Sequence, residues 1–345
     1  MNSSSSFDIN LNKEYVLGLI DYLCRPSLEP YPTANGYGIN ASVHVTLRKS
    51  EILLAVISQF LEYEGVEYRY ERRDSNGIPE RILINKPEDI CTLRGLGEGI
   101  FIQIAERLEY LVAVNREYGG KTIAGNEERF YKIYQPWTDM HPYWKNKKYT
   151  LDFFEEEFNT DINSITDTFE APDTKYPESI SREYVAGAFD GSGMVSLLIN
   201  KQPVNNTGYG MTLSARITIS NPNIRVKPNF IRYFQNHGLE PGISERENRL
   251  EIRFDSVDQV QKFIEEIGGS TMYLYNLCEL FHSQLIPAYR DQYHTSKRGF
   301  LDMVRAFEDV AHERPRAQYT TEYFEEKWDL EEPEYALVAE IVGES

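Results

Sequence analysis

The sequence predicts an α+β protein made of two similar halves, and two matches along its 345 residues carry that prediction. The first is an apolar helix signal, which occupies residues 14–21 in one half and 183–190 in the other, at an offset of 169 positions. The second is an alternating segment, residues 36–47 against 208–219, at an offset of 172. Because the two offsets are nearly equal, we expect the halves to share one order of elements.

The elements of the first half follow from its local patterns. Residues 36–47 alternate with period two, which predicts a strand with one buried and one solvated face. Residues 50–63 form an amphipathic helix pattern that closes at Gly65. A hairpin is predicted over residues 68–85 around Asn76-Gly77, and helices over residues 86–118 with a break at the glycines near position 96.

The second half repeats this order. Its predicted elements are strands at 194–202 and 208–219, a helix at 226–236 closing at Gly238, a hairpin of 242–246 with 249–254, and helices at 256–267 and 273–289. The first strand of this half has only an irregular counterpart at residues 25–34, because Pro26, Pro30 and Pro32 interrupt that segment. We therefore expect the first half to be the more degraded copy.

The acidic charge of the chain is unevenly distributed. The net charge of −18 argues against a polyanionic partner, because binding nucleic acid depends on lysine and arginine. Two acidic segments, 151–173 and 321–345, hold most of this charge, whereas no acid occurs from position 191 to 239. A shorter acid-free stretch spans positions 30–50. Strands contain few acids in general, so the two readings of these stretches are an ordinary sheet and a nucleic-acid surface.

The outward positions of the predicted strands carry small hydrogen-bonding side chains with an occasional cation. Such side chains suit base edges and phosphates, although an exposed antiparallel face without a ligand has a similar composition. We expect double-stranded DNA as the partner and keep RNA as the alternative. The candidate nucleic-acid-binding residues are Asn40, Ser42, His44, Thr46, Arg48, Ser196, Asn200, Lys201, Gln202, Thr212, Ser214, Arg216 and Thr218.

The paired helix signals and the strands that follow them resemble the LAGLIDADG homing endonuclease family, in its single-chain, two-repeat form. The resemblance covers residues 12–118 and 181–289. It implies αββαββα repeats related by a pseudo-twofold axis, with a saddle of antiparallel sheets over DNA and a monomeric pseudo-dimer. It also implies that the motif helices pack together through small residues, here Gly18, Ala186 and Gly187.

The resemblance suggests four segments. These are a degraded first repeat at 1–118, a connector with an acidic linker at 119–180, a second repeat at 181–312 and an acidic C-terminal tail at 313–345.

The catalytic chemistry of the family is not matched by the residues of this chain. Family members cleave phosphodiesters with a carboxylate at the end of each motif helix, which holds divalent metal. The corresponding positions here are Leu23 and Ser192. Asp21 and Asp190 lie two residues earlier and point to a different side of the helix, so we expect them to be structural. The resemblance therefore implies a DNA-binding protein with impaired or lost cleavage.

Two alternatives remain open from the sequence. An active site-specific endonuclease would need Mg²⁺ as cofactor, held near Asp190 and Ser192. A protein-interaction scaffold would have kept the fold and lost nucleic-acid binding.

The remaining sequence features concern the compartment. No apolar run is long enough to span a bilayer, and the chain begins without a basic or apolar leader. The cysteines, Cys24, Cys91 and Cys278, are odd in number and widely spaced, which favours neither disulfides nor a thiolate zinc site. We expect a soluble protein of a reducing compartment, the cytoplasm.

Overall fold

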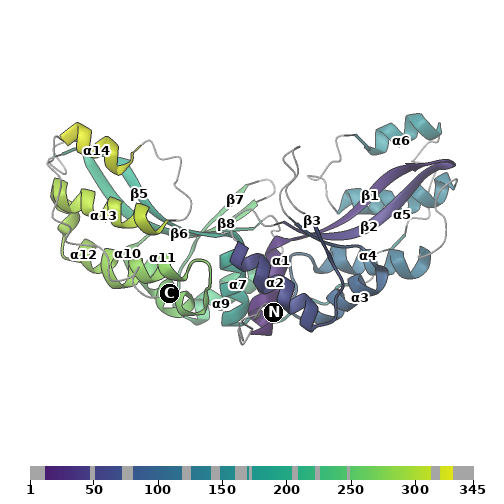
Figure 1. Cartoon of the computed structure of the whole chain (residues 1–345), viewed down its shortest axis with the longest axis horizontal. Coiled ribbons are helices and arrows are strands. Elements are labelled where there is room, and N and C mark those ends of the chain that lie inside the picture. The colour runs from purple at the N-terminus through teal and green to yellow at the C-terminus, as the bar shows by residue number, and fades with distance from the viewer. Residues whose placement is uncertain are drawn as a thin grey trace, which may run out of the picture. The chain divides into compact units, whose positions relative to one another are not determined.

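The computed structural model divides the chain into two compact units, Met1–Ile180 and Ser181–Ser345, whose helices and strands are labelled in Figure 1. The described residues are 12–46, 51–71, 81–118, 126–140, 148–159, 169–170, 173–203, 209–221, 226–246, 249–311 and 319–328. Within these ranges no helix is both long and apolar enough to cross a membrane.

The first unit is a four-stranded antiparallel sheet with helices packed on one of its faces. Its strands lie in the order β1-β2-β4-β3. Its elements are α1 (Lys13–Leu23), β1 (Cys24–Thr33), β2 (Gly36–Thr46), α2 (Glu51–Tyr63), β3 (Arg69–Glu71), β4 (Arg81–Ile84), α3 (Pro87–Leu96), α4 (Ala105–Tyr118), α5 (Glu127–Asp139) and α6 (Leu151–Phe158).

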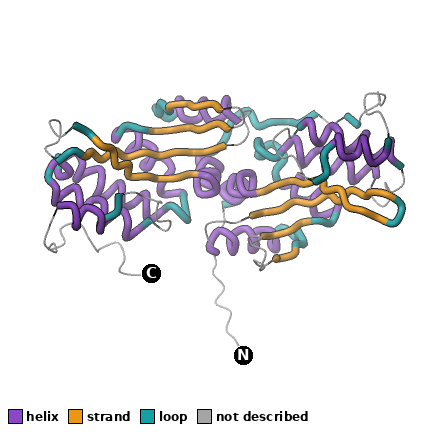
Figure 2. Tube along the Cα trace, turned by 90° about the horizontal axis from the view of Figure 1, so that it is seen from above, coloured by secondary structure: helices purple, strands orange, loops and turns teal. Residues whose placement is uncertain are grey.

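The second unit has the same arrangement, with the strand order β5-β6-β8-β7, and Figure 2 shows the strands of each sheet side by side. Its elements are α7 (Arg182–Ser192), β5 (Gly193–Lys201), β6 (Met211–Asn221), α9 (Lys227–Asn236), β7 (Gly242–Arg246), β8 (Arg249–Phe254), α10 (Val257–Ile267), η3 (Gly268–Ser270), α11 (Tyr275–Leu280), η4 (Phe281–Leu285), α12 (Ile286–Arg290), η5 (Tyr293–Thr295), α13 (Lys297–Val310) and α14 (Thr321–Trp328). The predicted α+β architecture of two repeats is confirmed.

Each unit begins with its motif helix buried in the core. In α1 the residues from Tyr15 to Asp21 are all buried, and the Asn12 side chain caps the helix by accepting from two backbone N–H groups. In α7 the residues from Tyr184 to Asp190 are buried, and Ser181 caps that helix. The small residues Gly18, Ala186 and Gly187 are buried in these stretches. Packing of one motif helix against the other stays a prediction.

The segment expected to be irregular is a regular ten-residue strand, β1, paired along its whole length with β2. The prediction from its prolines was wrong because β1 is an edge strand. Pro26, Pro30 and Pro32 occupy alternate positions, opposite Val43, Ile39 and Tyr37. In an antiparallel pair, alternate residues direct their N–H away from the partner, so on an edge these prolines remove no ladder hydrogen bond.

The predicted connector packs as part of the first unit instead of separating two repeats. Its helices α5 and α6 hold an aromatic cluster in which the Phe130 and Phe154 rings are 4.5 Å apart and Phe158 lies 5.7 Å from Phe130. Tyr37 of β2 joins this cluster at 5.1 Å from Phe154. The first unit therefore extends to Ile180, well past the predicted end at 118.

The same cluster occurs in the second unit, at positions 170 residues later for its helical members. Phe300 of α13 lies 5.0 Å from Phe324 and 5.4 Å from Trp328 of α14, and Tyr209, before β6, lies 5.4 Å from Trp328. A third sequence match underlies this likeness: residues 149–158, YTLDFFEEEF, correspond to residues 319–328, YTTEYFEEKW. The repeat unit therefore includes α5 and α6 in one half and α13 and α14 in the other.

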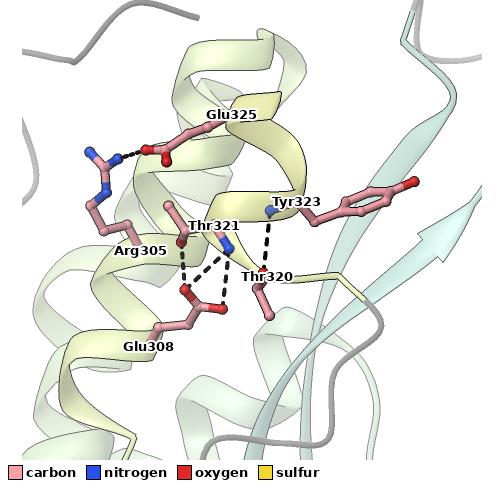
Figure 3. Close-up of polar contacts among 6 residues, drawn as sticks. All are labelled: Arg305, Glu308, Thr320, Thr321, Tyr323 and Glu325. Carbon is pink, nitrogen blue, oxygen red and sulfur yellow. Dashed lines mark hydrogen bonds and ion pairs between the residues drawn. The ribbon is translucent and has the colours of Figure 1, made fainter. Parts of the chain in front are cut away.

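Helix α14 is held on α13 by side-chain contacts that Figure 3 draws. Glu308 of α13 accepts from the backbone N–H of Thr321 at 3.2 Å and from the Thr321 hydroxyl at 2.5 Å. Arg305 forms an ion pair with Glu325. Thr320 caps the helix by accepting from the Tyr323 N–H at 3.3 Å, as Thr150 caps α6 by accepting from Phe153. Part of the predicted acidic tail is thus an ordered element of the second unit.

Candidate nucleic-acid interface

Each sheet has one buried face and one face, here called the polar face, that carries mainly polar side chains. Residues directly opposite in a ladder project to the same side, so the register defines these faces. In the first unit the polar face consists of Arg25, Ser27, Glu29, Tyr31, Asn40, Ser42, His44, Thr46, Arg69, Glu71, Arg81 and Leu83. In the second unit it consists of Met194, Ser196, Leu198, Asn200, Thr212, Ser214, Arg216, Thr218, Ser220, Ser244, Glu251 and Arg253.

Two predicted contact residues of the first polar face are buried. Ser42 is only 1 % exposed and His44 only 6 %, so the expectation that both are solvated was wrong. The register places His44 between Arg25 on β1 and Leu83 on β4, whose longer side chains flank it. Asn40 is exposed, as predicted, and Thr46 is half-buried.

His44 does not supply positive charge to this face near neutral pH. Burial lowers the pKa of its imidazole, nearby Arg81 lowers it further, and Glu29, 3.9 Å away, opposes the shift. Its Nε2 lies 2.9 Å from the Ser42 hydroxyl. His44 therefore acts as a neutral hydrogen-bonding group.

One arginine of each polar face forms an ion pair with an acid on or next to a strand of the same sheet. Arg81 and Glu71 are directly opposite in the ladder, with Nε 2.6 Å from Oε2. Arg216 forms an ion pair with Asp255, one position beyond the last paired residues of β6 and β8.

Most of the predicted residues of the second half share its polar face. Ser196 lies opposite Arg216, and Asn200 lies opposite Thr212, with its Nδ2 3.5 Å from the Ser214 hydroxyl. Thr218 lies on the same face and is half-buried. The structure thus brings six of the predicted residues onto one surface.

Two predicted residues, Lys201 and Gln202, lie away from the polar face. Lys201 belongs to the opposite side of β5 by register, and its ammonium lies 5.7 Å from the Tyr319 ring centroid. Gln202 is exposed just past the strand, where its N–H donates to the Gly210 carbonyl at 3.0 Å. Arg48 lies outside the described residues.

The sequence reasoning missed the contribution of β1 to the first polar face. Arg25 and Tyr31 are exposed there, and the Tyr31 ring covers Gly38, where a Cβ would lie 2.5 Å from Tyr31 Cζ. The alternation of polar residues between the prolines was the available signal. Burial and nearby Arg25 lower the pKa of the Arg107 guanidinium, on α4, to about 10.

The motif helix of the first unit ends in a network around Asp21. Its carboxylate is fully buried and accepts from the backbone N–H groups of Ile102, Gln103 and Ile104 at 2.9–3.1 Å. These residues lead directly into α4, so Asp21 ties the end of α1 to the start of α4. This is the structural role expected from the sequence.

The second unit repeats the network around Asp190. Its carboxylate accepts from the N–H groups of Met272, Tyr273 and Leu274 at 2.6–3.1 Å, directly before α11. Two residues later, the Ser192 hydroxyl donates to the Ala188 carbonyl at 3.0 Å. The matching position of the first unit, Leu23, ends α1 and has no polar side-chain atom.

Several solved structures share this architecture. The meganuclease I-SmaMI bound to an uncleavable DNA has a TM-score of 0.67 and 15 % identity, over 88 % of this chain and 98 % of that one. I-LtrWI bound to target DNA has a TM-score of 0.65 and 13 % identity, over 88 % and 98 % of the two chains. The chain has the LAGLIDADG homing endonuclease fold.

I-CpaMI, a LAGLIDADG meganuclease bound to uncleaved DNA, is similar as well, with a TM-score of 0.63 and 15 % identity over 87 % of this chain and 98 % of that one. No protein-family model matches the sequence, and no curated protein matches it either. The two-repeat LAGLIDADG fold predicted from the helix signals is nevertheless confirmed.

The residues at the motif-helix ends do not fit the divalent metal that the LAGLIDADG fold implies. Both oxygens of Asp21 and of Asp190 already accept backbone N–H groups, and Leu23 offers no ligand. Ser192 offers one neutral oxygen, a weak ligand for a hard cation. Across the described ranges, no group of three or more His, Cys, Asp or Glu residues could hold a metal ion.

Proposed function

We propose that this chain binds double-stranded DNA through the polar faces of its two sheets and that its phosphodiester cleavage is lost or severely impaired. The observation that carries the proposal is the repeated polar face, which in both units presents arginine, serine, threonine and asparagine side chains from four antiparallel strands. Arginine contacts phosphates and guanine edges, and asparagine suits adenine. Hydroxyl groups donate to phosphates and can donate to or accept from base edges.

The neighbours with the same fold support DNA as the partner. The I-SmaMI, I-LtrWI and I-CpaMI structures are described as bound to DNA. RNA remains the second candidate partner, because hydroxyl and amide side chains also contact RNA.

The loss of cleavage is proposed from the motif-helix ends. A phosphodiester hydrolase of the metal-dependent type needs carboxylates free to hold its cations, and the two nearest acids are occupied by backbone amides. Leu23 and Ser192 cannot take their place.

A selection experiment tests both parts. The full chain is incubated with a pool of random-sequence DNA duplexes in Mg²⁺ at low salt, and the bound fraction is amplified and sequenced over several rounds. We expect enrichment of particular duplexes, recovered at full length. Cut ends within an enriched sequence would contradict the loss of cleavage, and the absence of any enrichment would contradict DNA binding. A parallel RNA pool that alone becomes enriched would replace DNA with RNA as the partner.

A further inference from the structure

Each polar face holds a partly exposed arginine against a carboxylate of the same sheet. In the first unit, Arg81 is 30 % exposed and Glu71 27 %, with the two side chains directly opposite in the ladder. In the second unit, Arg216 is 34 % exposed and Asp255 48 %. Glu71, Arg81 and Arg216 belong to the polar faces on which the proposed function places nucleic acid, and Asp255 directly follows β8 beside Arg216.

A carboxylate and a phosphodiester compete for the same guanidinium. Both are anions with oxygen pairs that match the planar fork of arginine, and both bind it through charge-assisted hydrogen bonds. Ion pairs at partly exposed sites are weak, because water and salt screen them. A backbone phosphate that binds Arg81 or Arg216 must therefore displace the paired carboxylate. It can do so because the ion pair is weak.

We infer that Glu71 and Asp255 are guard carboxylates: each occupies its arginine in the free protein and must yield that arginine to a phosphate of the bound nucleic acid. This inference rests on the proposed function. The guards lower the affinity for every duplex by a similar amount, since all duplexes present the same phosphates. Because all duplexes share this loss, the ratio of specific to non-specific affinity is unchanged, and the guards lower the occupancy of non-specific DNA at a given protein concentration.

The second unit offers well-matched controls for the net charge. Glu245 forms an ion pair with Lys227, but the register places it opposite buried Leu250, away from the polar face. Asp258 lies three residues from Asp255 and pairs instead with Arg290. Glu245→Gln and Asp258→Asn each remove one negative charge and one ion pair, as Asp255→Asn does.

The test measures binding of the full chain to a fluorescent random-sequence duplex by anisotropy, over a series of salt concentrations. We expect Asp255→Asn to raise the affinity at low salt by about threefold or more, the size of a weak exposed ion pair. We also expect it to steepen the slope of log affinity against log salt by about 0.9, equivalent to one additional phosphate contact. Glu71→Gln is expected to act in the same direction through Arg81, and both controls to stay within about twofold of wild type.

A double-mutant comparison distinguishes release of the Arg216 guanidinium from the general effect of removing one negative charge. In an Arg216→Ala background, Asp255→Asn should no longer raise the affinity, because the guanidinium that it releases is absent. An equal gain in that background, or an equal gain for Glu245→Gln, would overturn the inference while leaving the proposed function standing. If neither wild type nor Asp255→Asn binds duplex or RNA at any salt, the proposed function itself fails. Circular dichroism and thermal melting confirm that each variant is folded.

Discussion

The carboxylate of Asp190 lies 2.9 Å from the backbone nitrogen of Leu274, although 84 residues separate the two positions. The first unit contains the same relationship, with Asp21 2.9 Å from the backbone nitrogen of Ile104. In each unit the acid at the end of the motif helix satisfies backbone N–H groups that would otherwise be buried without partners. The acid near the end of each motif helix is thus tied to the fold.

We expect Asp190→Asn to destabilise the chain by about 2–4 kcal/mol, because an amide has one acceptor oxygen and turns an N–H toward the backbone donors. Urea unfolding followed by circular dichroism measures the change. Asp291→Asn, at an exposed position of the same unit, is the control and should change the free energy of unfolding by less than about 0.5 kcal/mol. Equal small effects of both substitutions would contradict the structural role of Asp190.

The lowered pKa of His44 predicts that the free energy of unfolding decreases as the pH falls. Because its folded-state pKa is lowered, the unfolded chain binds more protons than the native chain as the pH falls through about 6.5, and stability declines. Burial is the largest cause of the lowered pKa of His44. The charged groups that face its imidazole are Arg25, Glu29, Glu71 and Arg81.

The variant His44→Gln tests this dependence. Glutamine can keep a hydrogen bond to Ser42 but does not titrate, so the loss of stability between about pH 7 and pH 5 should be smaller than in wild type. It should not vanish, because burial also lowers the pKa of His294. An unchanged pH profile, measured by thermal unfolding in matched buffers, would contradict a buried neutral His44.

The aromatic clusters predict that α6 and α14 are integral parts of their units. Phe154 and Phe324 are both 0 % exposed, so replacing either with alanine should cost about 3–5 kcal/mol. The control is Tyr63→Ala, at a side chain that is 87 % exposed, and we expect a change below about 0.5 kcal/mol. If Phe154→Ala behaved like the control, the segment after residue 118 would be a connector after all.

The docking of α14 depends on Glu308 (Figure 3). Glu308→Gln removes the charge that holds the N–H and hydroxyl of Thr321, so α14 should open more often. Amide hydrogen exchange over residues 321–328 should become faster by about tenfold, for a loss of about 1.4 kcal/mol. Exchange should remain unchanged in α6 of the first unit, which is the internal control. Equal protection of α14 before and after substitution would contradict this account of its docking.

The residues at the motif-helix ends do not fit a divalent metal, so we expect divalent metal to leave the stability of the chain unchanged. A specifically bound cation stabilises the native state by an amount that rises with its concentration. At constant ionic strength, we expect Mg²⁺ and a chelator to leave the melting temperature unchanged. A saturable rise in the melting temperature with Mg²⁺, lost in Asp190→Asn but not in Asp291→Asn, would restore the nuclease alternative.

Much of the fold could be predicted from two kinds of local signal. The predicted hairpin strands of the second half match β7 and β8 residue for residue, because period-two alternation and a polar turn are properties of neighbouring residues. The failure at β1 had a physical cause: whether a proline disrupts a strand depends on whether that strand lies at an edge, which only the sheet order decides. The match between residues 149–158 and 319–328 is visible in the sequence but lies in acidic segments, whose composition is typical of linkers and tails.

The sequence predicted which residues share the polar face of each sheet, but not how exposed their side chains are. Alternation correctly placed Asn40, Ser214 and Arg216 on the polar face. It could not show that Ser42 and His44 are covered, because burial on that face depends on the side chains of neighbouring strands. The pairing of Arg216 with Asp255 joins residues 39 positions apart and also required the tertiary structure.

The most direct test of DNA binding through the polar faces is the affinity of Arg216→Glu for an enriched duplex, compared with that of Lys227→Glu. Both variants reverse one positive charge in the second unit, and each removes one ion pair. Only Arg216 lies on the polar face, so we expect Arg216→Glu to weaken binding by about tenfold or more at low salt and Lys227→Glu to stay within about twofold of wild type. Equal affinities for the two variants would contradict the proposed interface.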